Sequence, residues 1–367
     1  MCGKNSLLTR FTDKSIAKNT TSNSCAMKYG VFWVAVACAC MLSGQSARAA
    51  GGCGSVCLPL EALDTEKIQL RQNQFRIGIT TEHADFDNFR EGGSDINNPG
   101  GNKAFISQTT LFLDYGFTRK FTASLLIPYV RKRQETSKFG TRIAEGIGDI
   151  SVFGRYEILT PSIRTEPSVS IGLGLKFPSG SISEPNDSTL LPPAFQTGSG
   201  AYDIVPTVSF YQDLNGYILF GSVFARIPLE KNSRGYKFGN EIELNTGVEY
   251  PLPVPVDWIS VLMGISYLHA QHDRDANRFL PARLRNGTEV LNTGGDFLDF
   301  VPGFRIEMGR SFSLQARFFV PVFEDWNGNR ATNVGQVAPD LTTQINLVYS
   351  MTHRTNKIRS IDRSLRQ

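Results

Sequence analysis

The chain near its C-terminus reads Leu341-Thr342-Thr343-Gln344-Ile345-Asn346-Leu347-Val348-Tyr349-Ser350-Met351. Apolar and polar side chains alternate here along most of the segment. A strand with this period of two has one apolar face and one polar face. A length of about ten residues is typical of strands that cross a membrane within a barrel, with lipid on one side and the lumen on the other. The segment therefore predicts a membrane barrel strand.

The same period recurs throughout the chain from Gln72 onward, and no segment settles into the 3.6-residue period of an amphipathic helix. The twelve segments that carry it are approximately 72–83, 104–116, 121–133, 149–159, 168–177, 201–212, 217–228, 240–250, 258–270, 297–308, 312–323 and 340–351.

The connections between these segments alternate between long and short. The long ones are 84–103, 134–148, 178–200, 229–239, 271–296 and 324–339, and the short ones are 117–120, 160–167, 213–216, 251–257 and 309–311. Bacterial outer-membrane barrels have long external loops and short periplasmic turns. The sequence therefore predicts an all-β fold, a transmembrane antiparallel up-and-down β-barrel of about 12 strands, within a range of 10 to 14.

Residues 1–49 form a leader whose core, 27–49, has the features of a signal peptide. A short basic lead at Lys28 precedes the apolar segment 31–42, and Ala47-Arg48-Ala49 is a small-x-small cleavage site. A single membrane anchor is the alternative, but the apolar segment is short and the cleavage site follows at once. We expect a periplasmic N-terminal segment over 50–71, the barrel over 72–351 and a basic tail over 352–367.

Charge and cysteine usage agree with export. Basic residues exceed acidic ones in the leader and in the tail, while acidic residues exceed basic ones between them, so no nucleic-acid partner is indicated. Cys53 and Cys57 are the last cysteines of the chain and can close a small disulfide in an oxidising compartment. A metal or redox site is the sharper interpretation, but no His or second Cys pair accompanies them, which favours a disulfide or inert thiols.

Alternation assigns a set of charged and aromatic side chains to the lumen. These are Arg76, Phe112, Asp114, Phe153, Arg155, Glu157, Arg226, Glu241, Glu243, Arg305, Glu307, Arg317 and Phe319. Both signs of charge are present, so strong selection for anions or cations is not indicated. The set is interpreted either as paired charges that make the lumen rigid or as a polar path with aromatic rings that weakly bind ring compounds.

Four prolines recur at or near the outer ends of outward-going strands: Pro128, Pro178, Pro228 and Pro321. Proline cannot donate to the hydrogen-bond ladder, so it marks a strand end, an edge or a bulge. The simpler interpretation is that pairing stops there. The functional hypothesis is a break in the wall through which an apolar solute leaves sideways into lipid.

Residues that could carry chemistry are sparse. His269, His272 and Asp273 are residue types that bind metal ions. They lie where a strand ends and a loop begins, so a solvated loop is favoured over a metal site. No nucleophile motif, phosphate-binding glycine loop or zinc signature is present. The sequence therefore indicates a protein that is not an enzyme, with no cofactor and no metal.

Several phrases resemble a known family. They are Leu126-Ile127-Pro128-Tyr129-Val130, Gly146-Ile147-Gly148-Asp149-Ile150, Phe153-Gly154-Arg155-Tyr156, Gly172-Leu173-Gly174-Leu175-Lys176-Phe177-Pro178-Ser179-Gly180 and Gly198-Ser199-Gly200-Ala201-Tyr202-Asp203. Their order, over about 75–351, is similar to the outer-membrane transporters labelled "MetA-pathway of phenol degradation". The resemblance implies passage of aromatic or other hydrophobic compounds, and it supplies no catalytic residues. The chain departs from many barrels, which end on an aromatic residue, by continuing into its basic tail.

Two functions follow from these features. The first is an outer-membrane channel that passes small hydrophobic or aromatic compounds by passive diffusion, with outer-membrane lipid and those solutes as its partners. The alternative is a structural or surface-interaction barrel with a plugged lumen and external loops that bind a ligand. The sequence does not indicate the oligomeric state.

Overall fold

The structure, a computed structural model, describes residues 70, 72–163, 165–186, 189–309 and 311–351. The expected leader 1–49, Cys53 and Cys57, and the basic tail 352–367 lie outside the described residues.

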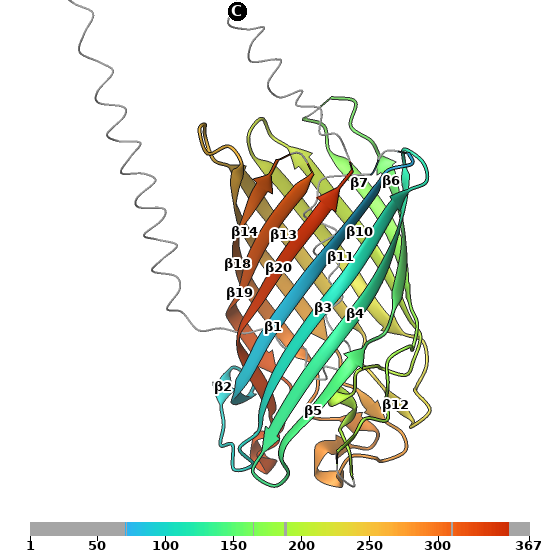
Figure 1. The fold of residues 1–367 in the computed structure, drawn as a ribbon. Helices are drawn as coiled ribbons and strands as arrows, with labels where there is room; N and C mark the ends of the chain where they lie inside the picture. Colours follow the sequence, from blue (N-terminus) through green and yellow to red (C-terminus); the bar gives the residue numbers. More distant parts are fainter. Residues whose placement is uncertain (1–69, 71, 164, 187–188, 310, 352–367) are drawn as a thin grey trace, which may run out of the picture. The chain divides into compact units, whose positions relative to one another are not determined.

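In the described part of the chain, twelve antiparallel strands form a closed barrel (Figure 1). The barrel strands are β1 (Phe75–Glu91), β3 (Lys103–Gly116), β4 (Phe121–Thr136), β6 (Ser151–Leu159), β7 (Ser168–Lys176), β10 (Asp203–Asp213), β11 (Ile218–Pro228), β13 (Glu241–Pro251), β14 (Ile259–Ala270), β18 (Gly295–Met308), β19 (Phe312–Trp326) and β20 (Gln336–Ser350).

Strand β1 closes the barrel because it pairs on both sides. Arg76 lies opposite Asp114 of β3 on one side and opposite Ser350 of β20 on the other. A closed sheet has no edge, so backbone N–H and C=O groups along the ladder find partners within the wall. The predicted fold class and strand number are confirmed.

One end of the barrel carries short turns and the other carries the longer connections (Figure 1). The longer connections contain small elements: β2 (Ser94–Asp95), β5 (Gly140–Ile147), β8 (Pro185–Asn186), β9 (Thr189–Leu190), β12 (Tyr236–Lys237), β15 (Arg274–Asp275), β16 (Arg285–Asn286), β17 (Glu289–Val290), and the 3₁₀ helices η2 (Pro193–Phe195), η3 (Ala282–Leu284) and η4 (Arg330–Thr332). We call the end of the barrel with the short turns the turn end, and the end with the longer connections the loop end.

Some predicted long loops are wrong in extent. The connection expected over 134–148 is a hairpin, in which β4 runs on to Thr136 and β5 returns against it. Strand β1 likewise continues to Glu91, well past the predicted end at residue 83. The alternation of apolar and polar residues weakens where a strand extends beyond the apolar belt. Backbone pairing continues there because adjacent strands extend beyond the belt as well.

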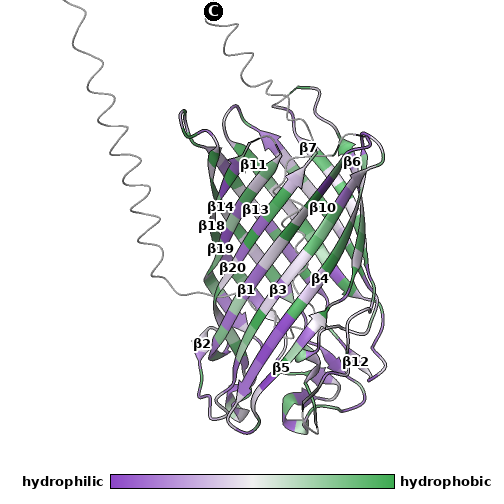
Figure 2. Cartoon of the chain, in the orientation of Figure 1, coloured by the Kyte–Doolittle hydropathy of each residue, from purple (hydrophilic) through white to green (hydrophobic). Residues whose placement is uncertain are grey.

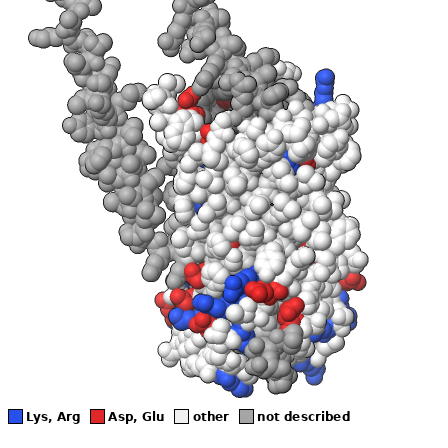
Figure 3. All heavy atoms as spheres, viewed as in Figure 1, with Lys and Arg blue, Asp and Glu red and all other residues white. Residues whose placement is uncertain are grey.

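The outward face of the wall is an apolar belt. Ile79, Leu111 and Leu173 point outward and are exposed, while their chain neighbours point inward. Figure 2 shows hydrophobic residues distributed over the strands, and Figure 3 shows a broad face with few charged side chains followed by a charged band toward the loop end. Ion pairs such as Lys103–Asp87 (3.1 Å) and Arg131–Glu145 (3.5 Å) belong to that loop-end region. Outer-membrane barrels present such a belt to lipid.

The ladder is interrupted at several places, and two of the interruptions adjoin the loop-end half of the barrel. Strand β4 pairs with β6 only as far as Leu126 and with β5 only from Tyr129, and Gly148–Ile150 form an irregular link in which the Gly148 N–H still donates to the Pro128 oxygen at 2.9 Å. Pairing between β19 and β20 ends at Phe319 opposite Thr342, although both strands extend further toward the loop end.

Candidate functional site: a lumen closed by an inserted loop

The connection between β7 and β10, residues 177–202, folds into the lumen, and we call it the inserted loop. Lys132 points inward from β4 and is buried. Its ammonium group donates to the backbone oxygens of Ala194 (3.0 Å) and Gln196 (2.8 Å). A wall side chain can reach these carbonyls only if the loop lies inside the barrel, so the loop obstructs the loop-end half of the lumen.

A buried ionic cluster holds the two ends of the inserted loop, and we call it the clasp. Lys176, the last residue of β7, lies 2.7 Å from Asp203, the first residue of β10, and 3.1 Å from Asp149. Ser199 donates through Oγ to Asp149 at 2.7 Å. Arg226 of β11 completes the cluster, since it pairs with Asp203 at 3.4 Å and also with Glu241. The clasp is defined by these residues: Asp149, Lys176, Ser199, Asp203, Arg226 and Glu241.

Backbone contacts explain why small residues flank the clasp. Gly180 and Ser199 both donate their N–H groups to the Asp149 carboxylate, at 3.0 and 2.8 Å. A Cβ built on Gly180 would lie 2.6 Å from the Cα of Gly198, which is closer than real side chains approach. The two chain segments therefore cross at backbone distance, and only glycine fits at the crossing. The phrases that carried the family resemblance, Gly-Asp, Pro-Ser-Gly and Gly-Ser-Gly, meet at this one point.

A buried apolar cluster lies on the inner wall in the loop-end half of the barrel, in contact with the inserted loop. Its main members are the buried side chains of Phe86, Leu268, Phe297 and Trp326, and Phe195 of the inserted loop packs against them. The rings of Phe297 and Trp326 meet edge to face, with centroids 4.6 Å apart. We call this group the loop-end cluster. It offers an apolar environment inside the barrel, next to the segment where β19 and β20 do not pair.

A second apolar group lies nearer the turn end: Phe112, Leu126, Phe153, Val205, Phe224 and Val348. Polar side chains share the inner wall with it. Arg76 pairs with Asp114 at 2.6 Å, Arg305 with Glu249 at 3.1 Å, and Arg317 donates to Gln344 at 2.7 Å. The inner wall thus combines neutralised charges with apolar rings.

The structure places the thirteen predicted lumen residues on the inner side of the wall. Ten are buried, and Arg155, Glu241 and Glu307 are half-buried. The clasp brings together Arg226 and Glu241, and Phe112 and Phe153 meet in the apolar group near the turn end.

The four prolines divide into two kinds. Pro228 ends β11 and Pro178 follows the end of β7, as expected for strand ends. Pro128 and Pro321 are not at outer ends, which corrects the predicted positions, because β4 continues to Thr136 and β19 to Trp326. Pro128 lies opposite the link between β5 and β6, where its backbone oxygen accepts from the Gly148 N–H at 2.9 Å. Pro321 adjoins a bulge, where Asp299 is opposite Pro321 and Leu298 is opposite Phe323.

Sequence reasoning missed the residues that close the lumen. Phe86 lies beyond the predicted end of its strand, and Trp326 points inward only because the bulge at Val322 shifts the alternation by one residue. Lys132 and Lys176 were within predicted strands and had the inward parity, so alternation alone could have identified them. The contacts of Phe195 had no sequence signal.

At the loop end, the connections after β11 and β14 form a small sheet of β12, β15, β17 and β16. Asp273 is buried beneath it and accepts hydrogen bonds from the Tyr236 hydroxyl (2.5 Å) and the Gly239 N–H (2.7 Å). Burial raises the pKa of Asp273 to about 7, and these two hydrogen bonds limit the rise. The pKa of Tyr236 is raised by its own burial and by the neighbouring carboxylate.

Neither a metal-binding cluster nor a membrane-spanning helix is present among the described residues. No group of three or more His, Cys, Asp or Glu side chains there can hold a metal ion. His269 instead hydrogen-bonds through Nδ1 to Asp296, at 2.9 Å, while Asp273 is turned toward Tyr236. No helix in the described part is long and apolar enough to cross a membrane.

Comparison with solved structures supports the fold. The COG4313 outer membrane channel from Pseudomonas putida F1 matches with a TM-score of 0.59 and 12% identity, over 78% of this chain and 98% of that one. The chain has the fold of an outer-membrane channel. No family model matches it, and no curated protein matches it.

Two weaker matches differ in what their names describe. The CymD monoaromatic hydrocarbon channel matches with a TM-score of 0.38 and 9% identity, over 78% of this chain and 90% of that one. The translocator domain of the autotransporter NalP from Neisseria meningitidis gives 0.39 and 11%, over 79% and 91%. Scores this low do not distinguish a solute channel from a secretion barrel.

Proposed function

We propose that this barrel lies in the bacterial outer membrane with its loop end outside, and passes small hydrophobic or aromatic compounds by passive diffusion. The observation that carries the proposal is the loop-end cluster. Phe86, Phe297 and Trp326 form an apolar group inside the loop-end half of the barrel, and a second apolar group lies nearer the turn end among polar inner-wall side chains. A ring compound leaving water gains free energy by burying apolar surface there, at roughly 25 cal/mol per Å².

The interrupted ladder between β19 and β20 supports a sideways exit. The loop-end cluster includes Trp326 of β19 and Ala338 of β20, on the two strands that do not pair there. Pro321 and Pro339 stand in this part of the two strands and have no N–H with which to pair. Strands without a ladder separate at lower cost, so the missing β19–β20 pairs weaken the wall beside the loop-end cluster.

The exit route is tested by a charge on the lipid-facing side of the interruption. Val322 is 67% exposed at the β19 bulge. Val322→Arg should reduce uptake of a labelled monoaromatic compound into cells that depend on this protein. Leu229→Arg, another exposed apolar residue beyond the end of β11, is the matched control and should leave uptake unchanged. Equal uptake by both variants, at equal amounts of folded protein, argues against the sideways route.

The inserted loop favours a second candidate function, a plugged structural barrel with ligand-binding loops. The clasp holds the two ends of the inserted loop, and Lys132 holds its backbone at Ala194 and Gln196. Solute flux through liposomes that contain the purified protein separates the two functions. Flux of small aromatic compounds supports the channel, and liposomes no more permeable than protein-free ones support the structural barrel.

A further inference from the structure

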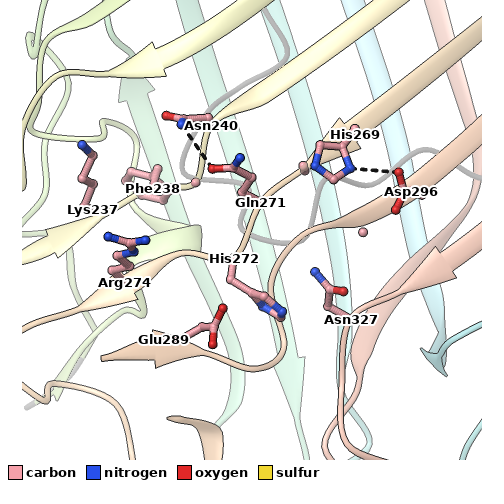
Figure 4. A pocket seen from close by; sticks show the side chains of 13 residues that line it. Lys237, Phe238, Asn240, His269, Gln271, His272, Arg274, Glu289, Asp296 and Asn327 are labelled. Atoms are coloured by element: carbon pink, nitrogen blue, oxygen red, sulfur yellow. Dashed lines mark hydrogen bonds and ion pairs between the residues drawn. The ribbon is translucent and has the colours of Figure 1, made fainter. Parts of the chain in front are cut away.

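A polar pocket of about 480 Å³ lies at the loop end, away from the lumen site (Figure 4). Its floor is the rim of the barrel, where His269 of β14 and Asp296 of β18 contribute side chains. Its wall is the small sheet, which contributes Lys237, Arg274 and Glu289. Asn240, Gln271 and Asn327 contribute amide side chains, and Phe238 and His272 also belong to the lining.

The pocket opens on the outer face of the wall, at the loop-end boundary of the apolar belt. His269 has the same parity along β14 as the exposed side chains of Tyr267 and Ile265, and Asp296 has the parity of Leu298 along β18. Successive side chains of a strand alternate between the two faces of the wall. A molecule in the pocket therefore has the apolar belt directly beneath it and water above it.

The pocket is lined by two cationic side chains, Lys237 and Arg274, and by two acidic ones, Glu289 and Asp296, and the two cations are neighbours. Lys237 and Arg274 are direct cross-strand neighbours on β12 and β15. Within the described residues, no carboxylate approaches either side chain to ion-pair distance, although Glu289 is the next cross-strand neighbour of Arg274. Two like charges placed directly opposite each other are destabilising unless an anion lies between them. This arrangement favours an anionic group such as a phosphate.

The rest of the lining suits hydroxyl groups. Asn240 and Gln271 are hydrogen-bonded to each other (3.1 Å), and each retains further amide donors or acceptors. The Asp296 carboxylate accepts from the Tyr267 hydroxyl at 2.6 Å, and this fixes the carboxylate that holds His269. Such alternating donors and acceptors match a polyhydroxylated ring.

We propose that this pocket binds the phosphorylated sugar headgroup of an outer-leaflet glycolipid, whose acyl chains lie along the belt below Tyr267 and Leu298. Lys237 and Arg274 bind the phosphate, and the amides with Glu289 bind the sugar hydroxyls. The proposal rests on the loop end facing outward, and it is independent of what passes through the lumen. A bound glycolipid would fasten the small sheet to the membrane surface.

The test uses the delipidated full-length protein in detergent and native mass spectrometry. Bisphosphorylated lipid A, dephosphorylated lipid A and inorganic phosphate are titrated separately. We expect the bisphosphorylated lipid to bind at least tenfold more tightly than the dephosphorylated one. The double variant Lys237→Gln/Arg274→Gln should lose about tenfold or more of that affinity. The charge-matched control Lys231→Gln/Arg283→Gln, at exposed positions outside the pocket, should bind as the wild type does.

Two results would overturn the proposal. One is equal affinity of the pocket variant and the control for the bisphosphorylated lipid. The other is phosphate alone binding as tightly as the lipid, which would indicate a free-anion site. If the pocket variant does not fold, hydrogen exchange on the wild type decides instead. Residues 271–289 should exchange more slowly with the lipid than without it, and unchanged exchange refutes binding there.

Discussion

Replacing Lys176 by Met tests whether the clasp keeps the lumen closed. The substitution keeps the length of the side chain and removes the ammonium group that lies 2.7 Å from Asp203 and 3.1 Å from Asp149. Both carboxylates are buried, and Arg226 then remains as the clasp's cation beside three acidic side chains. Asp203 keeps Arg226 as a partner, but Asp149 loses the cation beside it, and removing one partner of a buried ion pair costs about 3–5 kcal/mol.

This cost falls mainly on the state in which the inserted loop is seated. When the loop leaves the lumen, water can reach Asp149 and Asp203 and solvate them. A loss of about 3–5 kcal/mol in the seated state raises the ratio of unseated to seated molecules by about a hundredfold to several thousandfold. We therefore expect Lys176→Met to convert a mostly closed barrel into one that opens often.

Single-channel recording in planar bilayers measures this change as the fraction of time spent open. Lys120→Met, on the exposed turn between β3 and β4, removes the same charge without touching the clasp and serves as the control. Heat-modifiable migration on gels shows that each variant is folded. The double variant Lys176→Met/Asp149→Asn should recover part of the closed state, because it neutralises one of the stranded carboxylates.

An open fraction equal to that of the wild type, in a folded Lys176→Met protein, would refute this reasoning. It would mean that the inserted loop is held by packing and by Lys132 rather than by the clasp. A double variant that opens more than the single one would also contradict the electrostatic explanation.

Three further predictions concern the other parts of the site. Trp326→Ala removes the largest side chain of the loop-end cluster and should lower the free energy of unfolding by about 3–5 kcal/mol, measured by urea titration in detergent; a change below 1 kcal/mol would show that the cluster is loosely packed. Gly180→Ala places a Cβ against the backbone of Gly198 and should unseat the inserted loop, which limited proteolysis would detect as faster cleavage within residues 177–202, whereas Ser183→Ala should not change the rate. Because the pKa of Asp273 is raised to about 7, the folded protein holds a proton there that the unfolded chain releases above about pH 4. The stability of the small sheet should therefore fall as pH rises through that window, so that amides 236–239 exchange faster at pH 8 than at pH 5 after correction for intrinsic rates, and Asp273→Asn should abolish the difference.

The alternation along 341–351 and its repeats determined the fold class and the strand number, because a wall with lipid on one side and a wet lumen on the other imposes a period of two on each strand. Arg76, Asp114 and Phe112 were assigned to the inner face for the same reason. Strand ends were less well determined, since β1 and β4 continue beyond the belt, where the two faces no longer differ in polarity.

The closure of the lumen was decided only by tertiary structure. No periodicity of the sequence relates the clasp residues Asp149, Lys176, Ser199 and Asp203. The crossing of two glycine-containing segments brings them together. Trp326 faces inward only because a bulge shifts its strand by one residue. Period-two patterns encode which side of the wall a residue faces, but contacts across the lumen depend on how a loop packs between strands that are distant in sequence.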